Sequence, residues 1–421
     1  MNRRILNILS LILLCLCIKA QTSDSLIVAE LRKNNISFSH DNSVTLLTSG
    51  QEKYDDMFEA IRQAKSSVHL EYFNFRNDSI ANELFKILAV KAKEGVEVRA
   101  MYDAFGNMSN NRPLKKHHLE KIRATGVEIV EFDPTSFPWI NHVFSRDHRK
   151  IVVIDGKIAY TGGMNVADYY IHGTEVVGEW HDMHCRLEGS EVNTLQEIFL
   201  RAWNKEAKQN VGGEKYFGDG KPADGFVGLK KDTTATAYKK MVGIINREPY
   251  KTPKIMRQFY IACLDNAKDS VKILNPYISL THSVKKAIKR CLKRGIKFEI
   301  MMAEKSDIPI EPDVSFANLH WMMKRGATVH IYQGGFHHTK IIMVDGRLCT
   351  VGSCNLDARS LNYDREANAV IVDKNTTHEL ERIYEEQKKR CFLLTPEKWK
   401  TWRTRCQKFT GWWARLLNTW I

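Results

Sequence analysis

Two short segments of the 421-residue sequence carry the same set of chemically active residues. Each segment has a histidine, a lysine two positions later, an aspartate five positions after the lysine and, further along, a G-x-x-N tetrapeptide. The members are His148, Lys150, Asp155 and Asn165 in the first segment and His338, Lys340, Asp345 and Asn355 in the second. Equivalent residues are 190 positions apart throughout. Two such motifs in one register indicate an internal duplication.

The repeated residues fit an attack on a phosphodiester. That reaction needs a nucleophile, a proton for the departing alkoxide and positive charge beside the non-bridging oxygens. A neutral imidazole can attack phosphorus to give a covalent phosphohistidine, while a second, protonated imidazole donates to the leaving group. The lysines and asparagines would hold the phosphoryl oxygens by charge and hydrogen bonds. The scheme needs two half-sites and invokes no metal or other cofactor.

The two motif aspartates invite a second interpretation. The motif counts Asp155 and Asp345 among the candidate catalytic residues, but each directly precedes a glycine between two apolar runs. An Asp-Gly pair in that position is typical of a β-hairpin turn, so fixing the turn is the favoured role. We therefore expect each motif to lie on a hairpin, with its histidine and lysine on one face of the strand.

Each histidine also needs a carboxylate to set its tautomer and pKa. One candidate is Asp182, 34 residues after His148. Glu366 is the equivalent candidate, 28 residues after His338. The isolated histidines elsewhere, among them His184, are assigned no role.

Sequence upstream of the motifs repeats as well. Residues 64–68 (AKSSV) resemble residues 267–271 (AKDSV), and each is preceded by a helical pattern and continues into a short apolar strand. Strands that alternate with helices predict an α/β fold. We expect two duplicated halves, each a mixed sheet flanked by helices, with one active site at their interface.

The repeats set the predicted domain boundaries. The first half spans residues 40–204 and the second half residues 241–395, joined by a polar, Gly-containing connection over 205–240. Residues 1–20 and the Trp/Arg-rich residues 396–421 lie outside the two halves.

The N-terminus has the pattern of an export signal. Arg3 and Arg4 precede an apolar run over residues 5–18, and Ala20 offers a small residue for cleavage. The alternatives are an uncleaved anchor and lipid attachment at one of the two cysteines in this run. Export predicts a periplasmic enzyme, or one on the outer face of the cell membrane, associated with the membrane. The seven cysteines beyond residue 20 show no zinc-type spacing and are expected to be small buried residues, with one disulfide at most.

The charge balance predicts an anionic partner. The chain has 63 Lys and Arg against 49 Asp and Glu, a formal net charge of +14, which falls to +11 if residues 1–20 are removed. Nucleic acid, an acidic membrane and a phosphate-bearing substrate all fit this excess. The ordinary composition, with 43% hydrophobic residues, excludes a disordered or polytopic membrane protein.

The C-terminal segment concentrates tryptophan and cations. Five of the nine tryptophans lie there: Trp399, Trp402, Trp412, Trp413 and Trp420. Indole rings mixed with Lys and Arg are typical of a segment at a lipid headgroup boundary. A helix docked on the protein's own core fits equally well.

With these motifs the sequence resembles the phospholipase D superfamily, whose signature is a pair of H-x-K-x-x-x-x-D motifs, each followed by G-[GS]-x-N. Residues 162–168 (GGMNVAD), 180–182 (WHD) and 352–360 (GSCNLDARS), leading to Glu366, are most similar to the bacterial cardiolipin synthase branch. The resemblance covers residues 44–394. The chain departs from the family where the usual Trp-Arg-Asp reads Trp-His-Asp, and where residues 361–365 are more polar than usual.

The resemblance implies roles for single residues. His148 would be the nucleophile and His338 the general acid. Lys150, Lys340, Asn165 and Asn355 would bind the phosphate. Asp182 and Glu366 would orient the histidines. The implied reaction joins two phosphatidylglycerol molecules into cardiolipin and releases glycerol. We expect a monomer on an anionic membrane. The alternatives are a hydrolytic phospholipase D, an exported metal-independent nuclease or phosphodiesterase, and a non-catalytic lipid-binding module.

Overall fold

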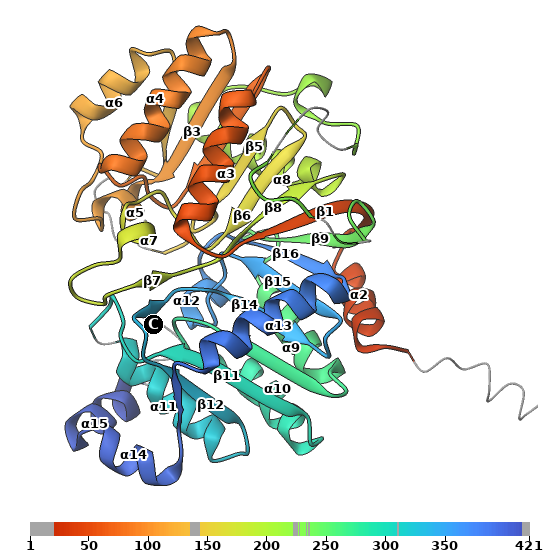
Figure 1. The fold of residues 1–421 in the computed structure, drawn as a ribbon, viewed down its shortest axis with the longest axis vertical. Helices are drawn as coiled ribbons and strands as arrows, with labels where there is room; N and C mark the ends of the chain where they lie inside the picture. Colours follow the sequence, from red (N-terminus) through yellow and green to blue (C-terminus); the bar gives the residue numbers. More distant parts are fainter. Residues whose placement is uncertain are drawn as a thin grey trace, which may run out of the picture.

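The computed structural model describes residues 21–134, 144–221, 226, 228–232, 234, 236–309 and 311–414. Within them the chain forms two α/β halves, one above the other in Figure 1, that meet where β1 and β9 lie side by side. Helix α2 (Ser23–Lys33) comes first in the chain. The elements of the first half are β1 (Ser39–Leu47), α3 (Gly50–Gln63), β2 (Ser67–Tyr72), α4 (Ser79–Lys93), β3 (Glu97–Asp103), α5 (Ala104–Met108), α6 (Lys116–Arg123), β4 (Glu128–Phe132), β5 (Ile151–Ile154), β6 (Ile158–Gly162), α7 (Tyr169–His172), β7 (Trp180–His181), β8 (His184–Glu188) and α8 (Glu191–Ala207).

The second half follows a short 3-10 turn at Glu214–Tyr216 and repeats the main order of strands and helices, except that β13 precedes the motif hairpin whereas β7 follows it. Its elements are β9 (Lys240–Arg247), α9 (Ile255–Asn266), β10 (Ser270–Leu274), α10 (His282–Lys293), β11 (Lys297–Ala303), α11 (Glu311–Met323), β12 (Thr328–Tyr332), β13 (Phe336–His337), β14 (Ile341–Val344), β15 (Leu348–Gly352), α12 (Ala358–Asn362), β16 (Glu366–Val372), α13 (Lys374–Lys388), β17 (Cys391–Leu393), α14 (Pro396–Trp402) and α15 (Arg405–Ala414).

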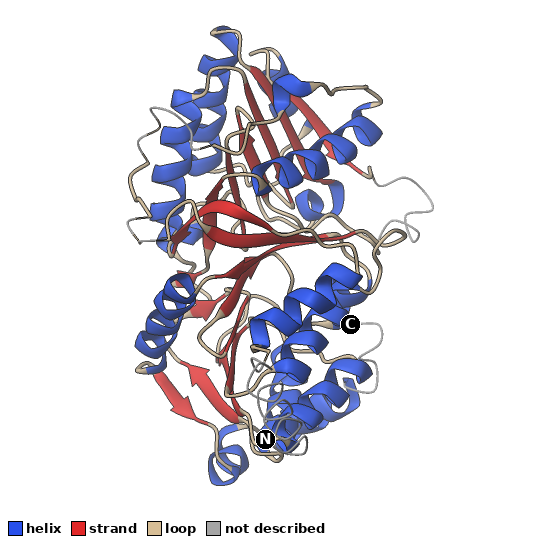
Figure 2. Cartoon of the chain, turned by 90° about the vertical axis from the view of Figure 1, so that its right-hand side faces the viewer, coloured by secondary structure: helices blue, strands red, loops and turns tan. Residues whose placement is uncertain are grey.

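A 15-stranded sheet runs through both halves in the order β17-β12-β11-β10-β14-β15-β16-β9-β1-β8-β6-β5-β2-β3-β4. The strands β2, β3 and β4 are parallel, as are β10, β11 and β12, and the inner strands are antiparallel. Figure 2 shows helices on both faces of the strands in each half. Because both faces are covered, the motif strands β5 and β14 are continuous apolar runs with every residue buried.

A second, two-stranded sheet joins the halves near the motifs. Its strands β7 and β13 are parallel, with Trp180 opposite Phe336 and His181 opposite His337. The backbone amide of His338 donates to the carbonyl of His181 at 2.7 Å. This sheet fixes the second motif against the first half.

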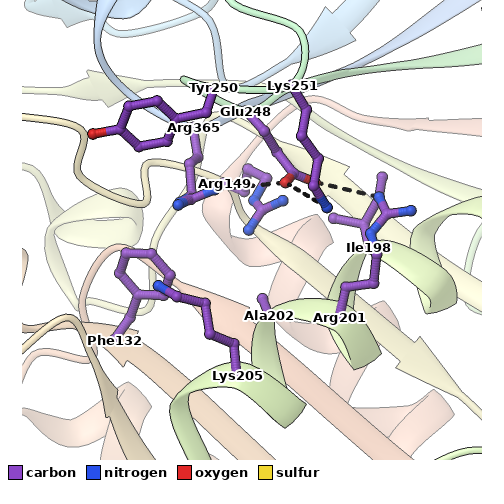
Figure 3. A pocket seen from close by; sticks show the side chains of 10 residues that line it. All are labelled: Phe132, Arg149, Ile198, Arg201, Ala202, Lys205, Glu248, Tyr250, Lys251 and Arg365. Carbon is purple, nitrogen blue, oxygen red and sulfur yellow. Dashed lines mark hydrogen bonds and ion pairs between the residues drawn. The ribbon is translucent and has the colours of Figure 1, made fainter.

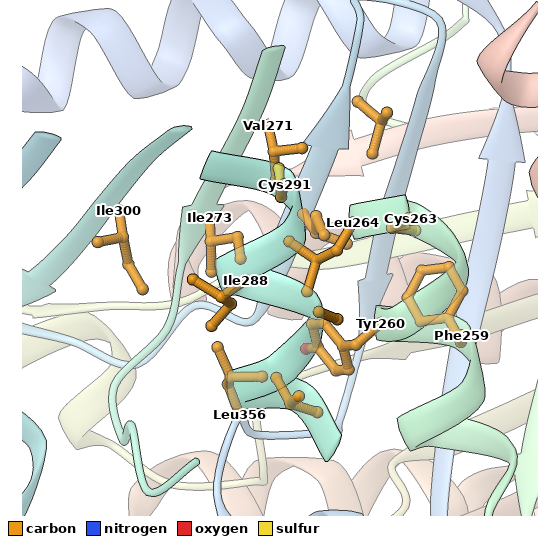
Figure 4. Packing of buried hydrophobic residues seen from close by; sticks show 14 of the residues in the cluster. Phe259, Tyr260, Cys263, Leu264, Val271, Ile273, Ile288, Cys291, Ile300 and Leu356 are labelled. Carbon is orange, nitrogen blue, oxygen red and sulfur yellow. The ribbon is translucent and has the colours of Figure 1, made fainter. Parts of the chain in front are cut away.

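Each half has its own helix-covered core. In the second half, α9 and α10 pack on β10 and β11 through residues such as Phe259, Ile273, Ile288 and Ile300 (Figure 4). The four side chains are at most 1% exposed. A third cluster of buried residues lies between the halves and includes Val44, on β1, and Val242, on β9. The halves therefore form one continuous body rather than two loosely linked units.

The segments at the two ends of the described chain pack on the second half. Helix α2, which the sequence patterns did not predict, contacts α9, and Asp24 pairs with Arg347 at 2.8 Å. The indole of Trp402 donates to Glu304 at 2.6 Å, and Trp399 stacks on His320. These two tryptophans are docked on the core.

Helix α15 exposes the remaining described aromatics of the C-terminal segment. Phe409, Trp412 and Trp413 are each more than half exposed. The interpretation as a docked segment is therefore confirmed for Trp399 and Trp402, whereas contact of the exposed Trp412 and Trp413 with lipid stays a prediction. Trp420 and residues 1–20 lie outside the described residues.

The structure also bears on membrane-spanning helices and on the cysteines. Among the described residues, no helix is long and apolar enough to cross a membrane. The seven cysteines from Cys185 onward are free, and five of them are buried, as expected for small core residues.

Candidate active site

The two motifs lie at equivalent positions, immediately before the first strand of a hairpin. His148 and Lys150 precede β5, and His338 and Lys340 precede β14. Each lysine Nζ donates to the backbone carbonyl of the histidine in its own motif at 2.5 Å. The expected hairpins are confirmed, since β5 pairs with β6 and β14 with β15.

The carboxylates are exchanged between the halves. His148 Nδ1 lies 3.1 Å from Glu366 Oε1, and His338 Nδ1 lies 2.7 Å from Asp182 Oδ2. Both candidate carboxylates therefore meet a histidine, but each meets the histidine of the opposite half. Because each Nδ1 faces a carboxylate oxygen, each ring holds its proton there and leaves Nε2 for chemistry. Neither half contains a complete histidine-carboxylate pair by itself.

The parallel pairing at the domain interface produces this exchange. On one side, β7 carries Asp182 into place beside β13, which leads to His338. On the other side, residues Asp147 and Arg365 form an isolated parallel bridge, and the amide of His148 donates to the carbonyl of Arg365 at 3.0 Å. Each bridge aligns a motif histidine with the residue that precedes the partner carboxylate. The spacing of these residues in the sequence does not indicate that the carboxylates are exchanged.

Burial decides the charge of the imidazoles. The side chain of His338 is 8% exposed and that of His148 13%. Loss of solvation lowers the pKa of both rings well below the usual range, and the two lysine ammonium groups lower it further. Both histidines are thus neutral at pH 7, which is the form that a nucleophile requires.

The lysines and carboxylates are shifted toward neutrality as well. Burial lowers the pKa of Lys150 to about 7 and that of Lys340 to about 8. Burial likewise raises the pKa of Asp182 to about 6 and that of Glu366 to about 7. A site with several groups that titrate near neutral pH responds strongly to one bound anion.

The two asparagines complete the polar lining. Asn165 and Asn355 are 5% and 6% exposed, and the Oδ1 atom of each is buried without a hydrogen-bond partner. Because Oδ1 can only accept, the NH2 group of each amide is the one that would donate to a phosphoryl oxygen. The Asn165 NH2 makes one long contact, 3.4 Å to the Tyr170 hydroxyl, and an NH2 group carries two N–H donors. This fits the phosphate-binding position that the motif predicts.

The motif aspartates lie at the turns. Asp155 accepts hydrogen bonds from the backbone amides of residues 65, 66 and 67 at 2.7 to 2.9 Å, and Asp345 does the same for residues 268, 269 and 270. Both have positive φ, as does the glycine after each, which is the geometry of a tight hairpin turn. Their place among the catalytic residues is therefore corrected: both carboxylates are occupied by backbone amides at the turn, and both position the hairpin.

Several residues that support the site were not found from the sequence. His184 accepts a hydrogen bond from the Met164 amide at 3.2 Å, and Asn368 does the same for the Cys354 amide. Each of these contacts fixes the backbone one residue before a phosphate-binding asparagine. The two acceptors occupy equivalent places, opposite the last residue of β6 and of β15. A histidine and an asparagine in these places share no sequence signal.

A buried lysine also supports the first half-site. Lys53 Nζ donates to the Asn165 carbonyl at 3.0 Å, and Tyr54 donates to the same oxygen at 2.9 Å. Lys53 is fully buried, and its ammonium lies over the rings of Tyr54 and Tyr72. From the upstream repeat, the equivalent residue in the second half is Met256. This lysine is therefore an asymmetric feature of the site.

Aromatic rings surround the imidazoles. Phe73 packs edge-on against His148, with the ring centroids 5.2 Å apart, and the Lys150 ammonium lies over its face. Trp180, Tyr277 and Phe336 have ring centroids within 6 Å of that of His338. These apolar rings, together with the low exposure of both imidazoles, limit the access of water to the site.

Known proteins resemble this chain in sequence over most of its length. A family model described as "Cardiolipin synthase, PLD-like domain" matches residues 57–203 and 260–388. The chain is 33% identical over 370 residues to cardiolipin synthase 2 of Staphylococcus epidermidis. The matched region covers 87% of this chain and 72% of that protein. It is 30% identical over 367 residues to the probable cardiolipin synthase YwiE of Bacillus subtilis, with 87% and 70% covered.

Solved structures share the fold. The crystal structure of phosphatidylserine synthase from Haemophilus influenzae Rd KW20 matches with a TM-score of 0.69 and 16% identity, over 94% of this chain and 100% of that one. Polyphosphate kinase from Porphyromonas gingivalis matches with a TM-score of 0.52 and 13% identity, over 82% of this chain and 50% of that one. The expected α/β fold with duplicated halves is confirmed.

Proposed function

The chain belongs to the family of cardiolipin synthases with phospholipase D-like domains, and on that premise we propose that it is a phosphatidyltransferase that converts two phosphatidylglycerol molecules into cardiolipin and glycerol. The observation that carries the proposal is the pair of exchanged contacts, His148 with Glu366 and His338 with Asp182. Two neutral, oriented imidazoles with two lysines between them fit one phosphodiester held between the halves. Both half-sites come from one chain, which supports a monomer as the active unit.

In the first step, His148 Nε2 attacks the phosphorus of one phosphatidylglycerol. The N–P bond forms and the P–O bond to the headgroup glycerol breaks, so the phosphatidyl group is held as a phosphohistidine. His338 supplies a proton to the departing oxygen, and glycerol leaves as the neutral alcohol. Glu366 stabilises the positive charge that develops on the His148 ring.

In the second step, the headgroup hydroxyl of another phosphatidylglycerol attacks the phosphohistidine. His338, now neutral, takes the hydroxyl proton, the new P–O bond forms, and the N–P bond breaks to release His148. The product is cardiolipin, and both histidines return to their initial state. Lys150 and Lys340 stabilise the non-bridging oxygens in both steps.

The charges around His338 support this order of events. Burial lowers the pKa of His338 well below its usual range, and Lys340 and Lys150 lower it further. A phosphodiester anion compensates those lysines, which favours the protonated ring that a general acid needs. The nucleophile and the acid therefore differ in protonation only when substrate is present.

The surroundings of the site favour transfer over hydrolysis. His338, which would activate an attacking water, has three aromatic rings within 6 Å, and Phe73 packs against His148, so water has limited access to a phosphohistidine there. The acceptor hydroxyl, in contrast, belongs to a second lipid, whose headgroup takes the place that the released glycerol leaves.

The proposed location is the outer face of the cell membrane or the periplasm. The signal-like pattern of residues 1–20 and the positive net charge support it. The outward-facing Trp412 and Trp413 of α15, near Lys408, supply the mixture of indole and cation that suits a lipid headgroup layer.

The test uses the purified full chain with vesicles of phosphatidylglycerol. Cardiolipin and glycerol should form in equal amounts, His148→Ala should abolish both, and the exposed His117→Ala should have no effect. Phosphatidic acid as the sole product would assign the chain to the hydrolytic phospholipases D. Cleavage of DNA or RNA without added metal, lost in His338→Ala, with no lipid product, would assign it to the nucleases.

A further inference from the structure

A cavity of about 220 Å³ lies where α8 meets the connection from β9 to α9 (Figure 3). Five of its lining residues are cations: Arg149, Arg201, Lys205, Lys251 and Arg365. Phe132, Ile198, Ala202 and Tyr250 form its apolar part. Among the described residues that line the cavity, Glu248 is the only acid.

The carboxylate of Glu248 is shared by three of these cations. Arg201 lies 3.3 Å from its Oε1, and Lys251 and Arg365 lie 3.5 Å and 3.8 Å from its Oε2. One negative charge thus faces three positive charges. The remaining two cations have carboxylates of their own outside the cavity wall, because Arg149 pairs with Asp147 and Lys205 with Glu206. The cavity therefore carries an excess of positive charge.

Arg365 is a cation of the cavity wall with incomplete hydrogen bonding. Its side chain is 15% exposed, its Nε is buried without a hydrogen-bond partner, and its contact with Glu248 is long. A buried guanidinium nitrogen without an acceptor is costly, and an anion in the cavity would supply the acceptor. Arg365 also lies in the stretch that is more polar than is usual in the family.

The cavity lies behind the catalytic residues. Arg149 stands between His148 and Lys150 in the sequence, and its side chain points to the opposite face of the chain, toward Glu71 and Asp147. Arg365 directly precedes Glu366, and its carbonyl accepts the amide hydrogen of His148 at 3.0 Å. The walls of the cavity and the catalytic pair His148 and Glu366 are thus built from the same two backbone segments.

We propose that this cavity is a second anion site, separate from the catalytic one, that binds a phosphate-bearing ligand. Guanidinium groups pair with phosphate through charge-assisted, bidentate hydrogen bonds, which matches Arg201 and Arg365. The volume fits a phosphate with a small polar group rather than a whole lipid, and the apolar wall fits a carbon chain next to it. The source of the phosphate is either a phospholipid headgroup at the membrane surface or a free phosphate compound. Binding there does not depend on the proposed activity.

The test compares two variants of the full chain with equal loss of charge. Arg201→Gln/Lys251→Gln removes two cations of the cavity that are 49% and 67% exposed, so the fold should be kept. Lys286→Gln/Lys293→Gln removes two exposed cations of α10 far from it in the fold. Crystals of each protein are soaked in tungstate, an electron-dense phosphate mimic, and the affinity for inorganic phosphate is measured by calorimetry.

We expect tungstate between Arg201, Lys251 and Arg365 in the parent and in the α10 variant, and none there in the cavity variant. Phosphate should bind at two sites per chain, with the cavity variant losing about tenfold or more at one of them. Tungstate only beside His148 and His338, or equal phosphate binding by all three proteins, would overturn the proposal.

Vesicles separate the two sources of phosphate. If the ligand is a lipid headgroup, vesicles that contain phosphatidylglycerol should bind the cavity variant more weakly than the α10 variant and should displace phosphate from the cavity. If the ligand is a free phosphate compound, both variants should bind the vesicles equally while the loss of phosphate binding persists. Either result supports the site and identifies its ligand, whereas equal vesicle and phosphate binding by both variants contradicts it.

Discussion

His148 and Glu366 are 218 residues apart in the chain, yet the imidazole Nδ1 lies 3.1 Å from the carboxylate Oε1. The pair crosses the boundary between the halves, and His338 with Asp182 crosses it in the other direction. One catalytic site is thus assembled only when the duplicated halves dock. An error in docking affects both pairs together.

The exchange predicts the effect of removing a carboxylate. Glu366→Gln keeps the shape of the side chain but not the charge that orients and stabilises the His148 ring. We expect the turnover number for cardiolipin formation to fall by about 10²-fold or more. Because Glu366 serves the proposed nucleophile, formation of the phosphohistidine in a single turnover should slow to a similar extent.

Asp182→Asn is the companion experiment. It acts on the proposed general acid, so it should slow release of glycerol most, and substrates with a better leaving group than glycerol should recover part of the lost rate. If leaving-group quality instead rescues Glu366→Gln and not Asp182→Asn, the roles of the two histidines are reversed.

The lysines predict the dependence of activity on pH. Burial lowers the pKa of Lys150 to about 7 and that of Lys340 to about 8, so both lose their charge as the pH rises through these values. The ratio kcat/KM, which reports on the free enzyme, should therefore begin to decline near pH 7 and fall more steeply above about pH 8. On the acid side the histidines stay neutral to well below pH 6.5, because burial and the lysines lower their pKa values.

Glu366→Gln sharpens this prediction. The Glu366 carboxylate raises the pKa of Lys150, so its loss should shift the alkaline decline of kcat/KM to lower pH. The pH profile of phosphate binding, measured by calorimetry, should shift in the same direction. A binding profile that is flat up to pH 9.5 in the parent would contradict the assignment of the lysines to the phosphate.

The duplication, the hairpins, the two motif histidines and the two carboxylates that meet them could be predicted from the sequence. These features follow from local patterns, since a repeated motif fixes residue types and an Asp-Gly pair between apolar runs fixes a turn. The partner of each histidine could not be predicted, because it depends on how β7 aligns with β13 and residue 147 with residue 365. The supporting residues His184 and Asn368 were missed for a related reason: two different residue types perform one backbone contact.

The turn aspartates give a test that separates folding from catalysis. Asp155→Ala removes the acceptor of three backbone amides, and we expect the free energy of unfolding to fall by about 1 to 3 kcal/mol. The rate per folded molecule should be unchanged at a temperature where the variant is fully folded. Urea titration and the assay at 15 °C measure the two quantities. A rate that falls with stability unchanged would return Asp155 to the catalytic residues.

Lys53 predicts an effect of opposite sign on stability. Burial lowers its pKa well below the usual range, so the unfolded chain binds a proton at this lysine that the folded chain disfavours. This penalty on the free energy of unfolding is largest at low pH. It shrinks as the pH approaches the pKa that Lys53 has in the unfolded chain. Lys53→Met, which copies the residue at the equivalent Met256 position, removes it. The gain in the free energy of unfolding relative to the parent should be larger at pH 6 than at pH 9, and equal gains at both would contradict the prediction.

The C-terminal tryptophans predict two separable phenotypes. Trp412 and Trp413 of α15 are exposed, so the variant Trp412→Ala/Trp413→Ala should keep the melting temperature of the parent. If these rings enter the headgroup layer, binding to vesicles of phosphatidylglycerol should weaken by about tenfold. Trp402→Ala is the matched control, because its indole packs on Phe316 and donates to Glu304. It should lower the melting temperature while the folded fraction binds vesicles normally, and unchanged vesicle binding by the α15 variant would exclude this helix as the membrane contact.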